Sequence, residues 1–159
     1  MTETLHASPL RPDQFDRAFA LIQLAFPGVS LERWQRHVET SRGHSDEGPG
    51  WIAAFDDKGY IHGLLAYRLE PDTPCGQSLV GHDIILACIA VGRTASCLIE
   101  GLAQMAWRNR CDAVHVLLPR IEDGGLDSGL ASVRDRLLES GFIDRGSHYC
   151  YRLRGECKR

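Results

Sequence analysis

Residues 89–102, IAVGRTASCLIEGL, join two apolar runs that differ in periodicity. The run that ends at Val91 is almost continuously apolar, which is typical of a central strand covered on both faces. From Ala95 onward, apolar side chains recur every three or four positions, which is the spacing of a helix. The stretch therefore predicts a buried strand, a turn over 91–96, and a helix that continues to about residue 109.

The turn has the composition of a helix start that could bind an anion. Such a start leaves backbone N–H groups unpaired at the positive end of the helix dipole, where a phosphate can accept hydrogen bonds from them. Gly92 and Ala95 are small enough for close approach of an anion. Thr94 and Ser96 offer hydroxyls, and Arg93 offers a charge-assisted contact. The same residues are ordinary in helix caps and turns, so a plain strand-to-helix connection is the alternative.

The rest of the chain alternates between extended and helical patterns, in the order β-α-α-β-β-β-α-β-α-(β)-β. The passage over 83–118 predicts a right-handed parallel crossover, and the DDKG turn at 56–59 predicts a hairpin before it. An α/β fold with a mixed sheet and helices on both faces follows, and 159 residues suit a single domain over 1–159. The predicted strands are 3–10, 51–55, 60–69, 82–91, 112–119 and 148–154; the helices are 11–26, 31–40, 95–109 and 130–140; the longer loops are 41–50, 70–79 and 120–129.

The composition argues against several classes of partner. A formal net charge of -3 gives no general affinity for nucleic acid, and no apolar run is long enough to span a membrane. The N-terminus lacks the pattern of a signal peptide. Six cysteines without a C-x-x-C pair indicate free thiols in a reducing, cytoplasmic setting. The seven histidines show no metal-ligand spacing, so we expect no metal.

Three local sequences, in this order of elements, resemble the GNAT superfamily of acyl-CoA-dependent N-acetyltransferases. LRPDQFDRAFALIQLAF (10–26) is similar to the family's first strand and helix. ILACIAV, leading into SCLIEGLAQMAWRNRCDAVHVLL (85–118), is similar to its cofactor-binding strand, helix and next strand. LASVRDRLLESGF (130–142) is similar to its late helix ending in Gly-Phe. The family usually has Gln/Arg-x-x-Gly-x-Gly/Ala at this turn, whereas residues 91–96 have one glycine and a shorter connection. Arg136, Leu137 and Leu138 stand where a catalytic Tyr is common.

The resemblance implies that acetyl-CoA is a co-substrate and that its acetyl group passes to a primary amine in a ternary complex. It implies that the diphosphate lies at the turn, that the pantetheine arm pairs with 89–91, and that the Val91 N–H stabilises the oxyanion. The acceptor would be a small-molecule or peptide amine. The predicted cofactor-binding residues are Ile89, Ala90, Val91, Gly92, Arg93, Thr94, Ala95 and Ser96.

Polar residues near the predicted strands supply the catalytic candidates. His82 and Asp83 open the central strand, where alternation places their side chains on opposite faces, so one of them would face the acceptor as general base. Tyr149 and Tyr151 share one face of the last strand, and either could protonate the leaving thiolate. A solvated strand start and aromatic packing on a sheet are the plainer interpretations of these pairs. His115 is more typical of a satisfied core or edge histidine than of a catalyst.

Two other interpretations of the whole chain stay open. A GNAT-like fold that has lost catalysis could serve as a binding or regulatory module, as the single glycine and the missing Tyr suggest. An unrelated α+β fold without CoA would follow if 89–102 formed one continuous helix. Cys88 is not expected to be a nucleophile, because its neighbours are apolar and no base is evident. Exposed strand edges near 148–154 would permit a homodimer.

Overall fold

The computed structural model describes residues 3–41, 50–72, 76–119, 128–146 and 148–154. Within these ranges the strands form one mixed seven-stranded sheet in the order β1-β2-β3-β4-β5-β7-β6. The predicted order of elements is confirmed, while most of the predicted loops 41–50 and 120–129 lies outside the described residues. The strands are β1 (Leu5–Pro9), β2 (Gly50–Asp56), β3 (Ile61–Asp72), β4 (Gly76–Leu86), β5 (Ala113–Val116), β6 (Ile143–Asp144) and β7 (Tyr149–Arg152); the helices are η1 (Pro12–Gln14), α1 (Phe15–Ala25), α2 (Leu31–Ser41), α3 (Val91–Arg108) and α4 (Ser128–Glu139).

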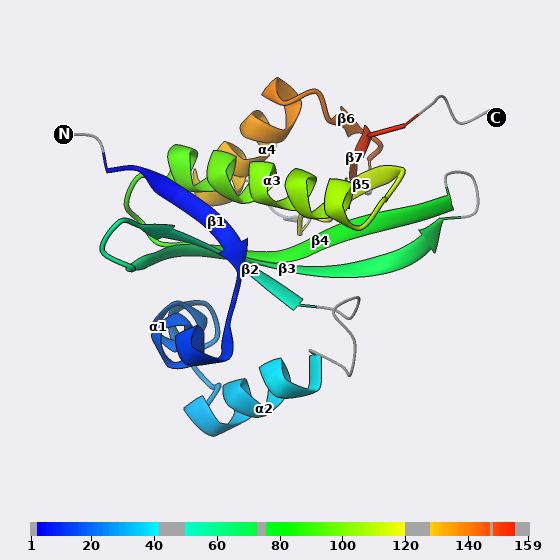
Figure 1. Ribbon diagram of the computed structural model, residues 1–159. Coiled ribbons are helices and arrows are strands. Elements are labelled where there is room, and N and C mark those ends of the chain that lie inside the picture. The colour runs from blue at the N-terminus through cyan, green and yellow to red at the C-terminus, as the bar shows by residue number, and fades with distance from the viewer. Residues whose placement is uncertain (1–2, 42–49, 73–75, 120–127, 147, 155–159) are drawn as a thin grey trace.

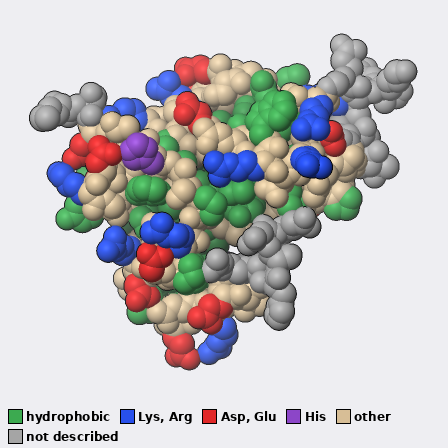
Figure 2. Space-filling view, viewed as in Figure 1, with side chains coloured by type: hydrophobic (Ala, Val, Ile, Leu, Met, Phe, Trp, Pro, Cys, Tyr) green, Lys and Arg blue, Asp and Glu red, His purple; other side chains and the backbone are tan. Residues whose placement is uncertain are grey.

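Helices cover both faces of the sheet, with α1 and α2 on one side and α3 and α4 on the other (Figure 1). Strand alternation explains the two cores, because neighbouring residues of β3 point to opposite faces. Leu64 packs in the α1–α2 core with Ile22, and Leu65 packs in the α3–α4 core with Leu98. On the outside, acidic and basic side chains are interspersed over α1 and α2 (Figure 2). None of the described helices is both long and apolar enough to cross a membrane.

The sheet opens between its two central parallel strands. Strands β1 to β4 pair antiparallel in sequence order, and α3 then crosses over to β5, which is parallel to β4 as predicted. The β4–β5 ladder covers only Ser78–Gly81 on β4, and its last hydrogen bond runs from the Leu117 N–H to the Gly81 carbonyl at 2.9 Å. Along the described residues, β4 therefore continues past Gly81 with no strand on its β5 side.

Two predicted boundaries are wrong. The segment 70–79 was expected to be a loop, but β3 runs to Asp72 and β4 begins at Gly76, with those two residues paired across the hairpin. The central strand was expected to reach Val91, but β4 ends at Leu86. Ala90 has a left-handed φ of 53°, which does not continue a regular strand, so the apolar run bends away from the sheet before the helix.

Candidate functional site

The open edge of β4 borders a narrow cleft. The Ala87 N–H donates to the His62 carbonyl on β3 at 2.8 Å. Backbone groups alternate in direction along a strand, so the N–H and carbonyl of Leu86 face the open side. A cavity of about 150 Å³ lies at this edge, between the end of β4, the start of α3 and the start of α4. It is lined by Ile84, Leu86, Ala87, Cys88, Val91, Gly129 and Leu130, and we call it the β4 cleft.

Helix α3 begins beside this cleft, four residues earlier than predicted. Ala90 is its N-cap, and the first helical hydrogen bond runs from the Thr94 N–H to the Ala90 carbonyl at 3.0 Å. The N–H groups of Val91, Gly92 and Arg93 have no acceptor among the described residues. They lie at the positive end of an 18-residue helix, so this turn is suited to an anion.

The predicted binding residues are therefore only partly brought together. Thr94 and Ala95 are buried in the α3 side of the core, and the Thr94 hydroxyl bonds back to the Ala90 carbonyl. The Ser96 hydroxyl likewise bonds to the Gly92 carbonyl at 3.1 Å. Both hydroxyls therefore already donate hydrogen bonds within the helix itself. Ile89, which was expected to lie on a strand edge, is exposed in the bend after β4.

Arg136 on α4 lies over the same helix start. A Cβ placed on Gly92 would come within 3.2 Å of Arg136 Nη2, so the guanidinium directly adjoins the glycine backbone. Its Nη1 pairs with Glu139 at 2.9 Å on the outer side of α4. In the sequence, Arg136 stands out only because the family often has a Tyr near this position. Its position depends on how α4 packs on α3, which no local pattern reveals.

Strand β4 carries a β-bulge at Asp83. The β3 register passes from Leu65↔Ile84 to Ala66↔His82, which leaves Asp83 as the extra residue, with φ 47°. The expectation that His82 and Asp83 point to opposite faces is wrong, because the extra residue interrupts the alternation. His82 Nδ1 and Asp83 Oδ2 are instead hydrogen-bonded at 3.0 Å.

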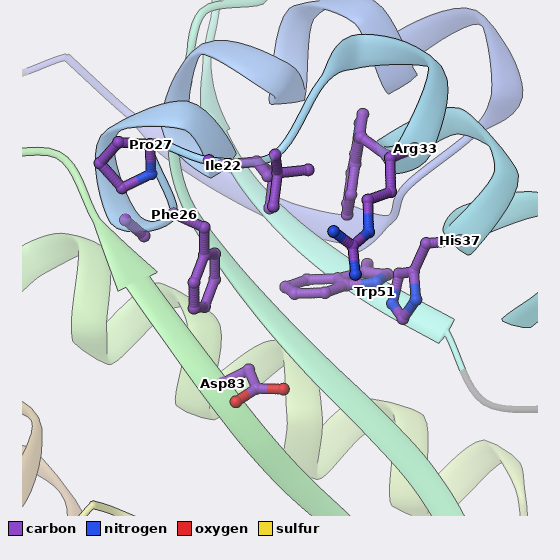
Figure 3. A pocket seen from close by; sticks show the side chains of 11 residues that line it. Ile22, Phe26, Pro27, Arg33, His37, Trp51 and Asp83 are labelled. Carbon is purple, nitrogen blue, oxygen red and sulfur yellow. The ribbon is translucent and has the colours of Figure 1, made fainter.

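Asp83 also lines a larger cavity of about 600 Å³ under α1 and α2 (Figure 3). Trp34 and Trp51 form an edge-to-face pair with ring centroids 5.3 Å apart. The Trp34 indole N–H donates to the Phe15 carbonyl, so its ring can serve as an apolar wall. We call this the aromatic cavity; its lining is Ile22, Ala25, Phe26, Pro27, Gly28, Val29, Arg33, Trp34, His37, Trp51 and Asp83.

The other candidate residues lie elsewhere. Tyr151 packs on Phe142 with ring centroids 5.3 Å apart, and burial raises the pKa of Tyr149. Neither tyrosine lines the β4 cleft or the aromatic cavity. His115 forms a hydrogen bond with Asp72 at 3.0 Å in a separate cavity. The prediction that its ring has a hydrogen-bond partner in the fold is therefore confirmed. Burial, and then the neighbouring His115, lowers the pKa of His148 there.

One described group of side chains has a geometry that could hold a metal ion, formed by Glu3, Asp56 and His62. Asp56 Oδ1 already accepts the backbone N–H groups of Lys58 and Tyr60 in the β2–β3 turn, and Oδ2 bonds to His62. This arrangement stabilises the hairpin and needs no ion.

No protein-family model matches the sequence, and no curated protein does. An N-acetyltransferase from Staphylococcus aureus is similar in structure, with a TM-score of 0.68 and 13% identity over 95% of this chain and 99% of that chain. An aminoglycoside N-acetyltransferase in complex with CoA gives 0.67 and 13%, over 100% and 97%. A glucosamine-6-phosphate N-acetyltransferase from Arabidopsis thaliana gives 0.61 and 15%, over 79% and 96%. The chain thus has the fold of the GNAT N-acetyltransferases, as the resemblance in its sequence implied.

Proposed function

We propose that this chain is an acetyl-CoA-dependent N-acetyltransferase that acetylates a primary amine by direct attack in a ternary complex. The observation that carries the proposal is the continuity of the site. The open edge of β4 leads at one end to the N–H groups of Val91, Gly92 and Arg93, which have no acceptor among the described residues, and at the other end to the His82–Asp83 pair. A thioester held between them would have its carbonyl carbon within reach of an amine on the α1–α2 face.

The donor half would bind through backbone groups. The diphosphate would accept hydrogen bonds from the N–H groups of residues 91–93, and Arg136 would add a charge-assisted contact. The pantetheine amides would pair with the free side of β4 near Leu86, much as a peptide adds to a sheet edge. Because Val91 begins α3, we assign the oxyanion contact to the Leu86 N–H instead of to Val91.

The acceptor half would depend on His82. If Nδ1–H donates to Asp83, the imidazole is held with Nε2 as an acceptor, which can take a proton from the amine directly or through water. The amine nitrogen then forms a C–N bond with the acetyl carbon, the C–S bond breaks, and CoA leaves as a thiolate that takes its proton from solvent. Holding both substrates in one cleft would supply much of the rate.

Two measurements test the proposal. Thermal-shift titration with acetyl-CoA, CoA and pantetheine should show stabilisation by the first two and less by pantetheine, which lacks the diphosphate. Release of free thiol from acetyl-CoA should then depend on an added primary amine. The absence of any shift with acetyl-CoA or CoA would refute the donor site.

A binding or regulatory module is the second candidate, and one observation favours it. Tyr149 and Tyr151 lie outside the β4 cleft, so no described tyrosine is positioned to protonate the thiolate. A module of this kind would be stabilised by CoA yet release no thiol with any amine in a broad panel. Amine-dependent thiol release would exclude it.

A further inference from the structure

We infer that the acceptor is a small zwitterion of the amino-acid class, with a primary amine, a free carboxylate and an aromatic or branched apolar body. This inference rests on the proposed function, since the amine must reach His82. It is carried by the aromatic cavity, where opposite charges and apolar walls line one space.

The walls of the aromatic cavity are suited to an apolar body. Trp34 and Trp51 are 2% and 7% exposed and so are held in place by the core, whereas Phe26, which also lines the cavity, is 46% exposed. The volume of about 600 Å³ lies within the range of small-molecule sites. Neither a polyamine nor an amino sugar offers a compact aromatic or branched apolar body for this space.

Arg33 supplies a positive charge that no described residue neutralises. It extends from α2 toward Trp51 in Figure 3, and its guanidinium makes no ion pair within the described ranges. Arg36, on the same helix, is instead paired with Glu32 at 3.0 Å and does not line the cavity. An arginine over an apolar pocket is a natural partner for a carboxylate, which it can bind through two parallel hydrogen bonds.

The negative charge is on β4. Asp83 lines the same cavity, across from Arg33 in Figure 3, and it bonds to His82. An ammonium drawn to Asp83 would arrive beside the imidazole that must take its proton. A zwitterion with its carboxylate at Arg33 and its amine at Asp83 would satisfy both charges and leave its body against the tryptophans.

Matched acceptors test this inference. L-phenylalanine carries all three features, phenethylamine lacks the carboxylate, L-phenylalaninamide has it neutralised, and L-alanine lacks the body. We expect kcat/KM for L-phenylalanine to exceed that of each of the others, and those of spermidine and glucosamine, by about tenfold or more. Equal or faster turnover of phenethylamine, or turnover of spermidine or glucosamine alone, would overturn the inference while leaving the proposed function intact.

Two variants on α2 test whether Arg33 causes the preference for an acceptor with a carboxylate. Arg33→Gln should lower the ratio of phenylalanine to phenethylamine turnover about tenfold, and Arg36→Gln should leave that ratio unchanged. An unchanged ratio in Arg33→Gln would contradict the assignment.

If no amine is acetylated, the proposed catalysis fails, and the cavity is tested by binding alone. In a Trp107→Phe background, L-phenylalanine should give a saturable change in the fluorescence of Trp34 and Trp51 that Arg33→Gln weakens. No saturable change would overturn the inference.

Discussion

At the scale of single residues, Asp83 decides what β4 can do. An uninterrupted strand would send His82 and Asp83 to opposite faces, where neither could orient the other. The bulge places the carboxylate 3.0 Å from the imidazole, beside the aromatic cavity. The φ of 47° at Asp83 is unfavourable for a residue other than glycine, and backbone strain of this kind is found most often at functional sites.

Removal of the His82 imidazole should disable transfer. In His82→Ala we expect kcat to fall by about 10²- to 10⁴-fold, because the amine loses its base, with little change in the KM for acetyl-CoA. Added imidazole should restore part of the rate, which a merely structural histidine would not allow. His6→Gln, at an exposed histidine paired with Asp57, is the control and should retain full activity. Full activity in His82→Ala would assign the proton transfer to another group.

The ionisation of Asp56 should make the stability of the fold depend on pH, independently of the proposed active site. The hydrogen bond from His62 holds the pKa of the Asp56 carboxyl below its usual value, with a further lowering from the Tyr60 and Lys58 N–H groups. A carboxyl whose pKa is lower in the folded state stabilises the fold when it is ionised. That stabilisation is complete above the unfolded-state pKa of about 3.9 and is lost as the pH falls through the folded-state pKa.

The Tm difference between the unmodified chain and Asp56→Asn should therefore be greatest near neutral pH and shrink in acid. Asp57→Asn, at an exposed neighbour, should change Tm little at any pH. A difference for Asp56→Asn that stays constant with pH would indicate poor packing of the amide instead of loss of the charge.

At the scale of elements, helix α3 presents its positive end at the β4 cleft, and α4 places Arg136 over it. The single glycine of the turn lies where this contact is closest. Arg136 thus contributes a charge to a turn with less glycine than the family pattern, and the hydroxyls of Thr94 and Ser96 serve the helix itself.

Arg136→Gln should weaken CoA binding about tenfold, the effect of losing one charge-assisted hydrogen bond. Pantetheine binding should not change, since it lacks the diphosphate. Arg134→Gln removes an exposed charge from the same helix and should leave the Kd for CoA unaltered. Equal weakening by both variants would indicate general electrostatic attraction and no specific contact.

The packing of α3 on β1 depends on Gly101. A Cβ at this position would lie 2.7 Å from the Cβ of Ala7, so Gly101→Ala must push the helix from the sheet. We expect a loss of about 1–3 kcal/mol in the free energy of unfolding, which outweighs the better helix propensity of alanine. Gly28→Ala, where a Cβ would meet nothing within 4 Å, is the control in urea denaturation. Unchanged stability in Gly101→Ala would show that β1 can move aside without cost.

At the scale of the whole molecule, the two cavities lie on opposite sides of the sheet, and β4 contributes residues to both. The β4 cleft lies toward α3 and α4, and the aromatic cavity lies toward α1 and α2. If the proposed function holds, both substrates would be bound at once and the acetyl group would pass directly between them. Cys88 was expected in a buried strand, but it is exposed and lines the β4 cleft. No hydrogen bond or ion pair of the described residues activates it.

Kinetics should therefore be sequential, with double-reciprocal plots that intersect, and Cys88→Ala should retain at least about half of the activity because no acyl-enzyme is needed. Parallel plots, together with loss of activity in Cys88→Ala and a chain mass raised by one acetyl group, would establish a covalent route instead.

The sequence by itself determined the order of the elements, the parallel crossover and the presence of a helix after the turn, although not the residue at which that helix starts. These follow from apolar periodicity and turn residues, which are local properties. Only the tertiary structure decided where β4 ends, the bulge at Asp83, and the places of Arg33 and Arg136. The physical reason is that register and bulges are set by pairing with neighbouring strands, and the surroundings of a charge are set by the packing of elements distant in sequence, so neither is encoded within the few residues concerned.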